Sequence, residues 1–299
     1  MPLWSAIEQQ IGAALRRSFS IAHRQPVGGG SISAAYLVTE RGSENERYFI
    51  KLSTASQHAM FDAEAAGLEE ILRSQTIRVP RPICVGTADD NAFLMMEYLD
   101  LRAGQATGKE AALLGQQLAN MHHVEQDRYG WKIDNTIGST PQANAYRDDW
   151  ICFWREQRLA PQLALAARNG YGGALQRHGE QLMAGLPSLF ATYVPRPSLL
   201  HGDLWSGNYA IEQGGQPVIY DPALYFGDRE TDLAMTELFG GFPARFYDAY
   251  RAAFPVDDGY AVRRTLYNLY HILNHLNLFG GGYRTQVEAM LASLLSELN

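Results

Sequence analysis

The sequence predicts an α+β fold with two lobes, a small antiparallel sheet at the N-terminal end and a larger, mostly helical C-terminal lobe. Three observations favour this fold. Short strand-like runs alternate with turn residues in the first third of the chain, and apolar residues then recur mostly at helical spacing. A polar motif, His201-Gly202-Asp203, interrupts the helical part. We expect lobes at 1–98 and 99–299, joined by a hinge at about 97–102.

The composition excludes several classes of function. With 299 residues, 46% hydrophobic and 19% charged, the chain is typical of globular proteins. The net charge is −7 and no Lys/Arg run stands out, so we expect no nucleic-acid partner. No signal-peptide pattern or bilayer-length apolar run is seen, so we expect no membrane partner and a cytoplasmic location. Cys84 and Cys152 lie far apart among apolar residues, which predicts buried thiols rather than a disulfide or metal site.

A glycine cluster follows the first predicted elements. Residues 3–18 have the apolar spacing of an amphipathic helix. Gly28, Gly29, Gly30 and Ser31 then separate two strand-like segments. Glycines let the backbone approach a ligand closely, and such a loop can offer N–H groups to nucleotide phosphates. The signal is weak alone, because glycine clusters often mark plain turns.

A lysine and a glutamate follow at suggestive positions. Residues 41–43 predict a hairpin turn, and the returning strand 47–52 contains Lys51. A lysine there can bind nucleotide phosphates; otherwise it is a solvated strand-end residue. Residues 61–72 predict a helix whose Glu64 can pair with Lys51. The alternatives to Glu64, the next two glutamates at 69 and 70, are expected to be solvated.

The first lobe ends in a predicted hinge. Strands are expected at 83–86 and 92–98, split by a turn at 89–91. Met96, Glu97 and Tyr98 close the second strand and are the predicted hinge contacts to an adenine ring, through backbone groups.

Helices are predicted over most of the second lobe. One ends at His122-His123, a pair that we interpret as a helix-end cap without a ligand role. A long irregular segment follows at 129–144, of a kind that often carries function. The remaining helices are expected at 148–163, 174–192, 243–254 and 260–279.

The chemistry is concentrated at residues 199–222. An apolar pair leads into His201-Gly202-Asp203, Asn208 follows, and a strand-like run delivers Asp221. This order is typical of a kinase catalytic loop, in which Asp203 would accept a hydroxyl proton while Asn208 and Asp221 hold Mg²⁺ beside ATP. The alternative is a loop with three solvated polar residues, but the joint pattern favours the kinase.

Two further positions leave alternatives open. Asp232 stands where a helix should begin, which suggests an N-cap. The helix at 260–279 carries His271, Asn274 and His275 near its end, and this end is either a sugar-facing wall or a polar rim.

The parts resemble the protein-kinase-like superfamily in its aminoglycoside-phosphotransferase branch, and within it the fructosamine-3-kinase (ketosamine-3-kinase) family. Four segments carry the resemblance: residues 28–33, residues 138–144 together with 149–150, Leu200 to Asn208, and Tyr225 to Glu230. The resemblance covers nearly the whole chain and implies a two-lobed protein-kinase-like fold.

The resemblance also implies the reaction. The enzyme would transfer the γ-phosphoryl group of ATP, with Mg²⁺, to the 3-hydroxyl of a ketosamine that is free or attached to a protein lysine. This activity reverses glycation, because the 3-phosphate is unstable. The rival hypotheses are another small-molecule kinase of the aminoglycoside or choline kinase type, and a pseudokinase that binds nucleotide without catalysis.

Residue roles follow from the same resemblance. Asp232 would accept backbone N–H bonds from the loop near His201, so that both residues give structural support. We assign Trp205 and His275 to the substrate, with packing as the alternative for Trp205. We expect a monomer. Some family members carry a cysteine at the position of Ser31, where it can link two subunits.

Overall fold

The computed structural model describes residues 2–28, 33–43, 46–102 and 106–298. The chain divides into two compact units. The N-terminal unit comprises Met1–Gln105 and Ala210–Pro222, and the C-terminal unit comprises Ala106–Tyr209 and Ala223–Asn299. The sequence predicts a boundary near 97–102, with residues 210–222 in the second lobe. These residues pack with the N-terminal unit because their strands pair with its backbone.

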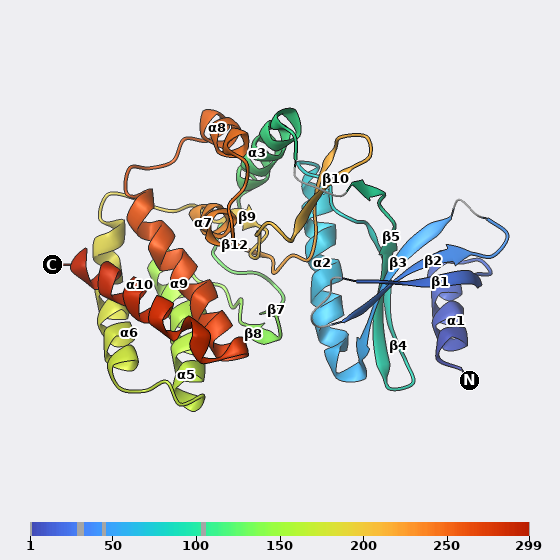
Figure 1. The fold of residues 1–299 in the computed structure, drawn as a ribbon, viewed down its shortest axis with the longest axis horizontal. Coiled ribbons are helices and arrows are strands. Elements are labelled where there is room, and N and C mark those ends of the chain that lie inside the picture. Colours follow the sequence, from blue (N-terminus) through green and yellow to red (C-terminus); the bar gives the residue numbers. More distant parts are fainter. Residues whose placement is uncertain (1, 29–32, 44–45, 103–105, 299) are drawn as a thin grey trace. The chain divides into compact units, whose positions relative to one another are not determined.

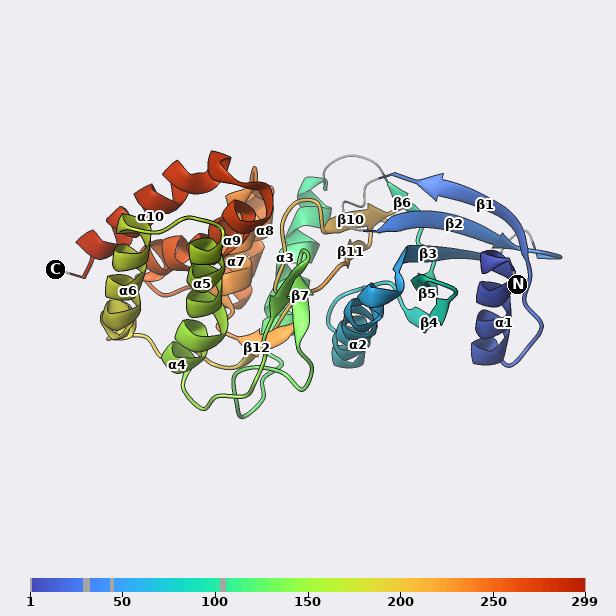
Figure 2. The same cartoon turned by 90° about the horizontal axis from the view of Figure 1, so that it is seen from below.

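The N-terminal unit is built on a five-stranded antiparallel sheet in the order β1-β2-β3-β5-β4 (Figures 1 and 2). Its elements are α1 (Leu3–Leu15), β1 (Ile21–Val27), β2 (Ala34–Glu40), β3 (Arg47–Thr54), α2 (His58–Ser74), β4 (Pro82–Ala88) and β5 (Asn91–Glu97). The hairpins predicted around residues 41–43 and 89–91 are confirmed. A second sheet joins β6 (Leu101–Arg102), β10 (Tyr209–Glu212) and β11 (Pro217–Ile219).

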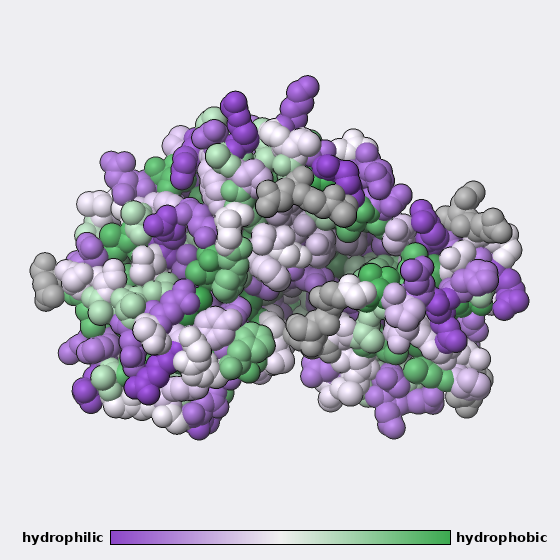
Figure 3. All heavy atoms as spheres, viewed as in Figure 1, coloured by the Kyte–Doolittle hydropathy of each residue, from purple (hydrophilic) through white to green (hydrophobic). Residues whose placement is uncertain are grey.

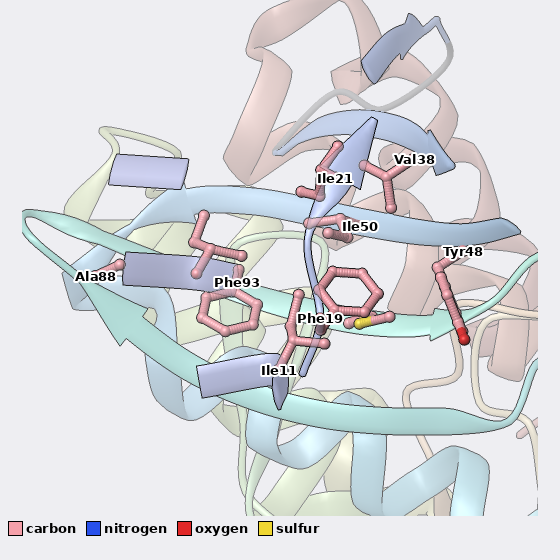
Figure 4. Packing of buried hydrophobic residues seen from close by; sticks show 10 residues of the cluster. Ile11, Phe19, Ile21, Val38, Tyr48, Ile50, Ala88 and Phe93 are labelled. Carbon is pink, nitrogen blue, oxygen red and sulfur yellow. The ribbon is translucent and has the colours of Figure 1, made fainter. Parts of the chain in front are cut away.

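The five-stranded sheet lies between its two helices, so both of its faces are covered (Figures 1 and 2). Ile7 and Ile11 of α1, one turn apart, pack with Ile50 of β3 and Phe93 of β5 (Figure 4). Because successive strand residues face opposite sides, Lys51 lies on the other face, toward α2. This alternation delivers the lysine to the helix that carries Glu64.

The C-terminal unit is mostly helical (Figure 1). Its helices are α3 (Gly108–His122), α4 (Trp150–Trp154), α5 (Ala160–Arg168), α6 (Ala174–Gly185), α7 (Glu230–Leu238), α8 (Ala244–Ala253), α9 (Tyr260–Phe279) and α10 (Arg284–Ser296). A π-helical turn, Arg155–Leu159, joins α4 to α5, and 3₁₀ turns cover Leu186–Phe190 and Gly281–Tyr283. Two short antiparallel pairs remain, β7 (Asn135–Ile137) with β8 (Thr140–Gln142), and β9 (Ser198–Leu200) with β12 (Tyr225–Gly227).

Helix α9 is the central helix of this unit. It is buried over most of its length and packs against α5, α7 and α10. A helix that is buried on most sides belongs to the core rather than to a surface. The prediction of an α+β fold with a small antiparallel sheet and a mostly helical second part is confirmed.

The surface carries the expected polar cover. On the face shown in Figure 3, hydrophilic side chains are spread over the surface with apolar ones scattered among them. Among the described residues, no helix combines the length and apolar character that crossing a bilayer requires.

One local prediction is wrong. Asp232 does not cap a helix, because α7 begins at Glu230 and Asp232 lies in its first turn. The capping contact belongs to Asp228, whose Oδ1 accepts the backbone N–H of Glu230 at 3.0 Å. The carboxylate of Asp232 is occupied by more distant donors, described below.

Candidate active site

The polar motif lies at the end of a buried strand in the C-terminal unit. Leu200 of β9 pairs with Tyr225 of β12, and His201, Gly202 and Asp203 follow directly. Gly202 has a φ of +82°, and a Cβ at this position would lie 2.1 Å from the carbonyl oxygen of Ala223. Only glycine fits here, because it tolerates positive φ and needs no room for a side chain.

Asp232 accepts hydrogen bonds from the backbone of this turn. Its Oδ2 accepts the backbone N–H of His201 at 2.7 Å and its Oδ1 accepts that of Gly202 at 2.8 Å. Burial acts to raise the pKa of Asp232, but the bonds from His122 and from the backbone N–H outweigh it, and the pKa is lowered. Asp232 is therefore an ionised anchor for the loop backbone, the contact that the family resemblance implies.

His122 supports Asp232, and sequence reasoning missed it. Its Nε2 lies 3.1 Å from Asp232 Oδ2 and its Nδ1 lies 2.7 Å from the hydroxyl of Tyr250. Burial lowers the pKa of His122, so the ring is neutral, donates to the carboxylate and accepts from Tyr250. The available signal was spacing, because His122 follows Leu118 by four residues on the apolar stripe of α3. The ring of His123 instead stacks on Phe254 at 3.9 Å.

Asn208 closes the loop that begins at Asp203. Its Nδ2 donates to the backbone oxygen of Asp203 at 2.8 Å and lies 3.4 Å from the carboxylate Oδ2. The amide nitrogen is thereby committed to the loop. Its Oδ1 accepts no hydrogen bond from the described part of the chain, which leaves a neutral oxygen for another ligand.

Lys51 joins two carboxylates within the N-terminal unit. Its Nζ lies 2.6 Å from Glu64 Oε1 and 2.5 Å from Asp221 Oδ1. Burial acts to lower the pKa of Lys51, but the two carboxylates outweigh burial and raise it. The lysine is a fixed cation. Of the alternative partners, Glu69 is exposed and Glu70 pairs with Arg73.

Asp221 has an unusual backbone. Its φ is +59°, a left-handed value that costs a residue other than glycine roughly 1–2 kcal/mol. Its side chain is 45% exposed, although one oxygen is bonded to Lys51. The strained conformation is a feature that the surrounding structure must hold in place.

The predicted nucleotide contacts are described in part. Gly28 follows β1, and a Cβ there would meet nothing within 4 Å, whereas Gly29, Gly30 and Ser31 lie outside the described residues. Met96 is buried at the end of β5. Both the side chain and the backbone N–H of Glu97 are bonded within the N-terminal unit. Its carboxylate pairs with Arg78 at 2.7 Å, and its backbone N–H donates to the carbonyl of Arg81.

Tyr98 follows Glu97 outside the strand. The guanidinium of Arg47 lies over its ring, 4.4 Å from the centroid. An adenine contact at Tyr98 would therefore use its backbone rather than its ring.

Trp205 and His275 contact the same ring. Phe239, which sequence reasoning missed, lies 6.2 Å from Trp205 and 4.8 Å from His275 between ring centroids. Trp205 is 38% exposed. His275 Nδ1 is bonded to the backbone oxygen of His271 at 2.8 Å, so its Nε2 remains for other partners. These three rings form a partly exposed aromatic group, of which Trp205 lies two residues beyond Asp203 in the sequence.

The two polar residues that precede His275 on α9, His271 and Asn274, are buried. Asn274 Nδ2 donates to the carbonyl of Ile137, and its Oδ1 accepts from Gln162. His271 is buried, and burial lowers its pKa to about 3. Neither residue is part of a sugar-facing wall, and only His275 remains a candidate from this helix.

The two predicted metal ligands each offer an oxygen atom of a kind that suits Mg²⁺. No group of three His, Cys, Asp or Glu that could hold a metal occurs among the described residues. Mg²⁺ commonly takes only one or two protein oxygens when phosphates supply the rest. The carboxylate of Asp221 and the Oδ1 of Asn208 are hard ligands of this kind.

Comparisons with known proteins agree with the motifs. The family model described as fructosamine kinase matches residues 3–297. A protein named probable ketoamine kinase from Synechocystis is 46% identical over 98% of this chain and 97% of its own length. A protein-ribulosamine 3-kinase of Arabidopsis thaliana, named chloroplastic, is 43% identical over 91% of this chain and 82% of its own length.

Solved structures match over the same extent. A candidate fructosamine-3-kinase from Haemophilus somnus has a TM-score of 0.88 and 26% identity, and 98% of each chain is covered. A choline kinase from Streptococcus pneumoniae has a TM-score of 0.66 and 14% identity, with 98% of each chain covered. The second likeness concerns the fold alone and confirms the kinase-like architecture.

Proposed function

The chain belongs to the fructosamine kinase family, and from this premise we propose that it transfers the γ-phosphoryl group of ATP to the 3-hydroxyl of a ketosamine. The position of phosphorylation is supported by the plant relative, which is named a ribulosamine 3-kinase. The observation that carries the proposal is the anchoring of the His201-Gly202-Asp203 turn. Two backbone N–H groups of this turn are bonded to one buried carboxylate.

Asp203 acts as the base. It accepts the proton of the 3-hydroxyl while the oxygen–phosphorus bond forms and ADP leaves. Phosphoryl transfer depends mainly on position and charge, so a base fixed by its backbone suits the reaction. Asn208 contributes by closing the loop on the Asp203 backbone.

The nucleotide is held by the N-terminal unit. Lys51, oriented by Glu64, binds the α/β-phosphates, and the loop at residues 28–31 covers them. Met96, Glu97 and Tyr98 border the adenine. Asp221 and Asn208 would hold Mg²⁺, which neutralises phosphate charge when bound.

The acceptor contacts Trp205 and His275. Their shared neighbour Phe239 joins the two rings into one aromatic group, which would line the acceptor site. An aromatic face covers the apolar side of a sugar, and the free Nε2 of His275 can bond a hydroxyl group.

The setting of the reaction is part of the proposal. Cys84 and Cys152 are free thiols, as expected in a reducing cytoplasm. We propose a monomer that acts on free or protein-bound ketosamines. Size-exclusion chromatography at several protein concentrations tests the oligomeric state.

The experiment is a substrate panel with purified protein, ATP and Mg²⁺. Ribulose-lysine, fructose-lysine, choline and an aminoglycoside are compared, and ³¹P NMR identifies the phosphorylated carbon. We expect 3-phosphate formation on at least one ketosamine and none on the other acceptors. Turnover of choline or an aminoglycoside alone would assign a different small-molecule kinase, and nucleotide binding without turnover would assign a pseudokinase.

A further inference from the structure

Two buried amide side chains in the β7–β8 hairpin have no role in the function proposed above. Asn135 and Gln142 are paired across this hairpin, and Gln142 Nε2 donates to Asn135 Oδ1 at 2.8 Å. They are 8% and 1% exposed. Buried amides require partners, and these partners show what the hairpin holds.

The pair binds two successive backbone carbonyls. Gln142 Nε2 also donates to the carbonyl of Ala223 at 3.1 Å, and Asn135 Nδ2 donates to that of Leu224 at 2.8 Å. Gln142 Oε1 accepts the hydroxyl of Tyr270 at 2.7 Å. Both hydrogens and the oxygen of the Gln142 amide are therefore used, and its orientation is fixed by its neighbours.

Ala223 is in turn bonded to the catalytic loop. Its backbone N–H donates to the carbonyl of His201 at 2.9 Å. Its carbonyl oxygen is the atom that a Cβ on Gly202 would approach to 2.1 Å. Gln142 thus holds the residue against which the catalytic turn is packed.

The restraint extends along the turn within the same unit. Asp203 follows Gly202 directly, and its backbone oxygen accepts the Nδ2 of Asn208 at 2.8 Å. Fixing Ala223 therefore limits the conformations open to the turn and to Asn208, the predicted metal ligand that closes it.

We propose that Gln142 and Asn135 are positioning residues for phosphoryl transfer: their amides fix Ala223 and Leu224, and through Ala223 the turn that carries Asp203. The inference rests on the proposed kinase function but concerns residues that touch neither substrate nor nucleotide. Loss of the amide bonds should let this turn and Asn208 move, and this should weaken metal–nucleotide binding and slow turnover.

The chain offers a matched control. Gln162 of α5 is 2% exposed and makes the same kind of amide contacts, to Asn274 and Asn277. It has no bond to residues 223–224 among the contacts of the described residues. Gln162→Leu therefore removes a buried amide from the same unit and leaves the bonds of Gln142 and Asn135 to Ala223 and Leu224 in place.

The experiment compares Gln142→Leu, Gln142→Met and Gln162→Leu with the wild type. Methionine matches glutamine in length but donates no hydrogen bond, so Gln142→Met is informative if the leucine variant does not fold. Melting temperature reports stability. Electron paramagnetic resonance of Mn²⁺ with a non-hydrolysable ATP analogue reports metal binding without turnover, and kinetics give kcat and the KM for the ketosamine.

We expect both Gln142 variants to bind Mn²⁺ about 10-fold more weakly and to lose about 10- to 100-fold in kcat, the range expected for small displacements at a reacting centre, with little change in KM for the ketosamine. Gln162→Leu should lose stability but keep Mn²⁺ binding and kcat. Mn²⁺ affinity unchanged in the Gln142 variants, or reduced equally in Gln162→Leu, would overturn the inference. A wild type that binds Mn²⁺ and nucleotide but phosphorylates no ketosamine would instead refute the proposed function.

Discussion

The Oδ2 of Asp232 lies 2.7 Å from the backbone nitrogen of His201, a residue distant in the sequence. The bond fixes the backbone two residues before Asp203, and the second oxygen of the same carboxylate takes the next N–H. Because backbone N–H groups donate these bonds, Asp232 fixes the backbone of the loop directly. Asp232 therefore acts on the reaction through position alone.

The first prediction concerns Asp232→Asn. One oxygen becomes an NH₂ group that cannot accept, so either His201 or Gly202 loses its acceptor. We expect the free energy of unfolding to fall by roughly 1–3 kcal/mol, the usual cost of an unsatisfied buried donor. Urea unfolding measures this change, and kcat should fall together with it. An unchanged free energy of unfolding would show that the loop conformation does not depend on its bonds to Asp232.

Asp203→Asn tests the base. The variant should bind ATP as the wild type does but lose about 10²- to 10⁴-fold in kcat, the usual contribution of general-base catalysis. Isothermal titration with ATP serves as the control for folding and binding. A kcat near that of the wild type would assign the base elsewhere.

The third prediction compares Asp221→Ala with Asn208→Ala across a Mg²⁺ titration of turnover. A carboxylate contributes more to a hard cation than a neutral amide does, so Asp221→Ala should abolish turnover and Asn208→Ala should weaken it less. Asp221→Ala also leaves Lys51 with Glu64 alone. The assignment fails if Asn208→Ala is the more damaging change.

Local patterns predicted much of this site. The strand alternation that brings Lys51 to the helix of Glu64 is contained within a short stretch of sequence, and the resulting 2.6 Å contact is observed. Glycine at 202 was read from its motif, and the structure supplies the steric reason. Such features depend on neighbours in sequence, where spacing is informative.

Long-range contacts could not be predicted in this way. His122 looked like a helix-end cap, but its partner is 110 positions away. Asp232 looked like an N-cap because its position matched, whereas donors from another segment compete for its carboxylate. The role of Gln142 depends on Ala223, 81 positions away. No periodicity records such pairings, which tertiary packing alone creates.

The fourth prediction concerns acid stability. Burial lowers the pKa of His271 to about 3, whereas an unfolded histidine titrates near 6.5. As pH falls below about 6.5, the unfolded chain takes up this proton first, so stability is lost between about 6.5 and about 3. Between pH 7.5 and 5, the wild type should lose about 2 kcal/mol more than His271→Gln does. Urea titrations at both pH values measure the difference, and parallel losses would contradict the assignment.

The last prediction concerns redox control. Cys84 and Cys152 are the only cysteines, and both are free. The sequence predicts buried thiols, but each of the two is only half-buried. Burial raises the pKa of Cys84 to about 11. A hydrogen bond with the carboxylate of Asp149 raises the pKa of Cys152, which is an electrostatic cause rather than the apolar one expected.

Because the thiolate is the reactive form, both thiols should oxidise slowly near neutral pH. Position 31, where a cysteine could link subunits, is Ser31, and a hydroxyl forms no disulfide. Activity and elution volume on size-exclusion chromatography should therefore be the same with and without dithiothreitol after mild oxidation. A dimer that dissociates on reduction, or a several-fold gain in activity, would show that one thiol is reactive. Cys84→Ser and Cys152→Ser would then identify which one.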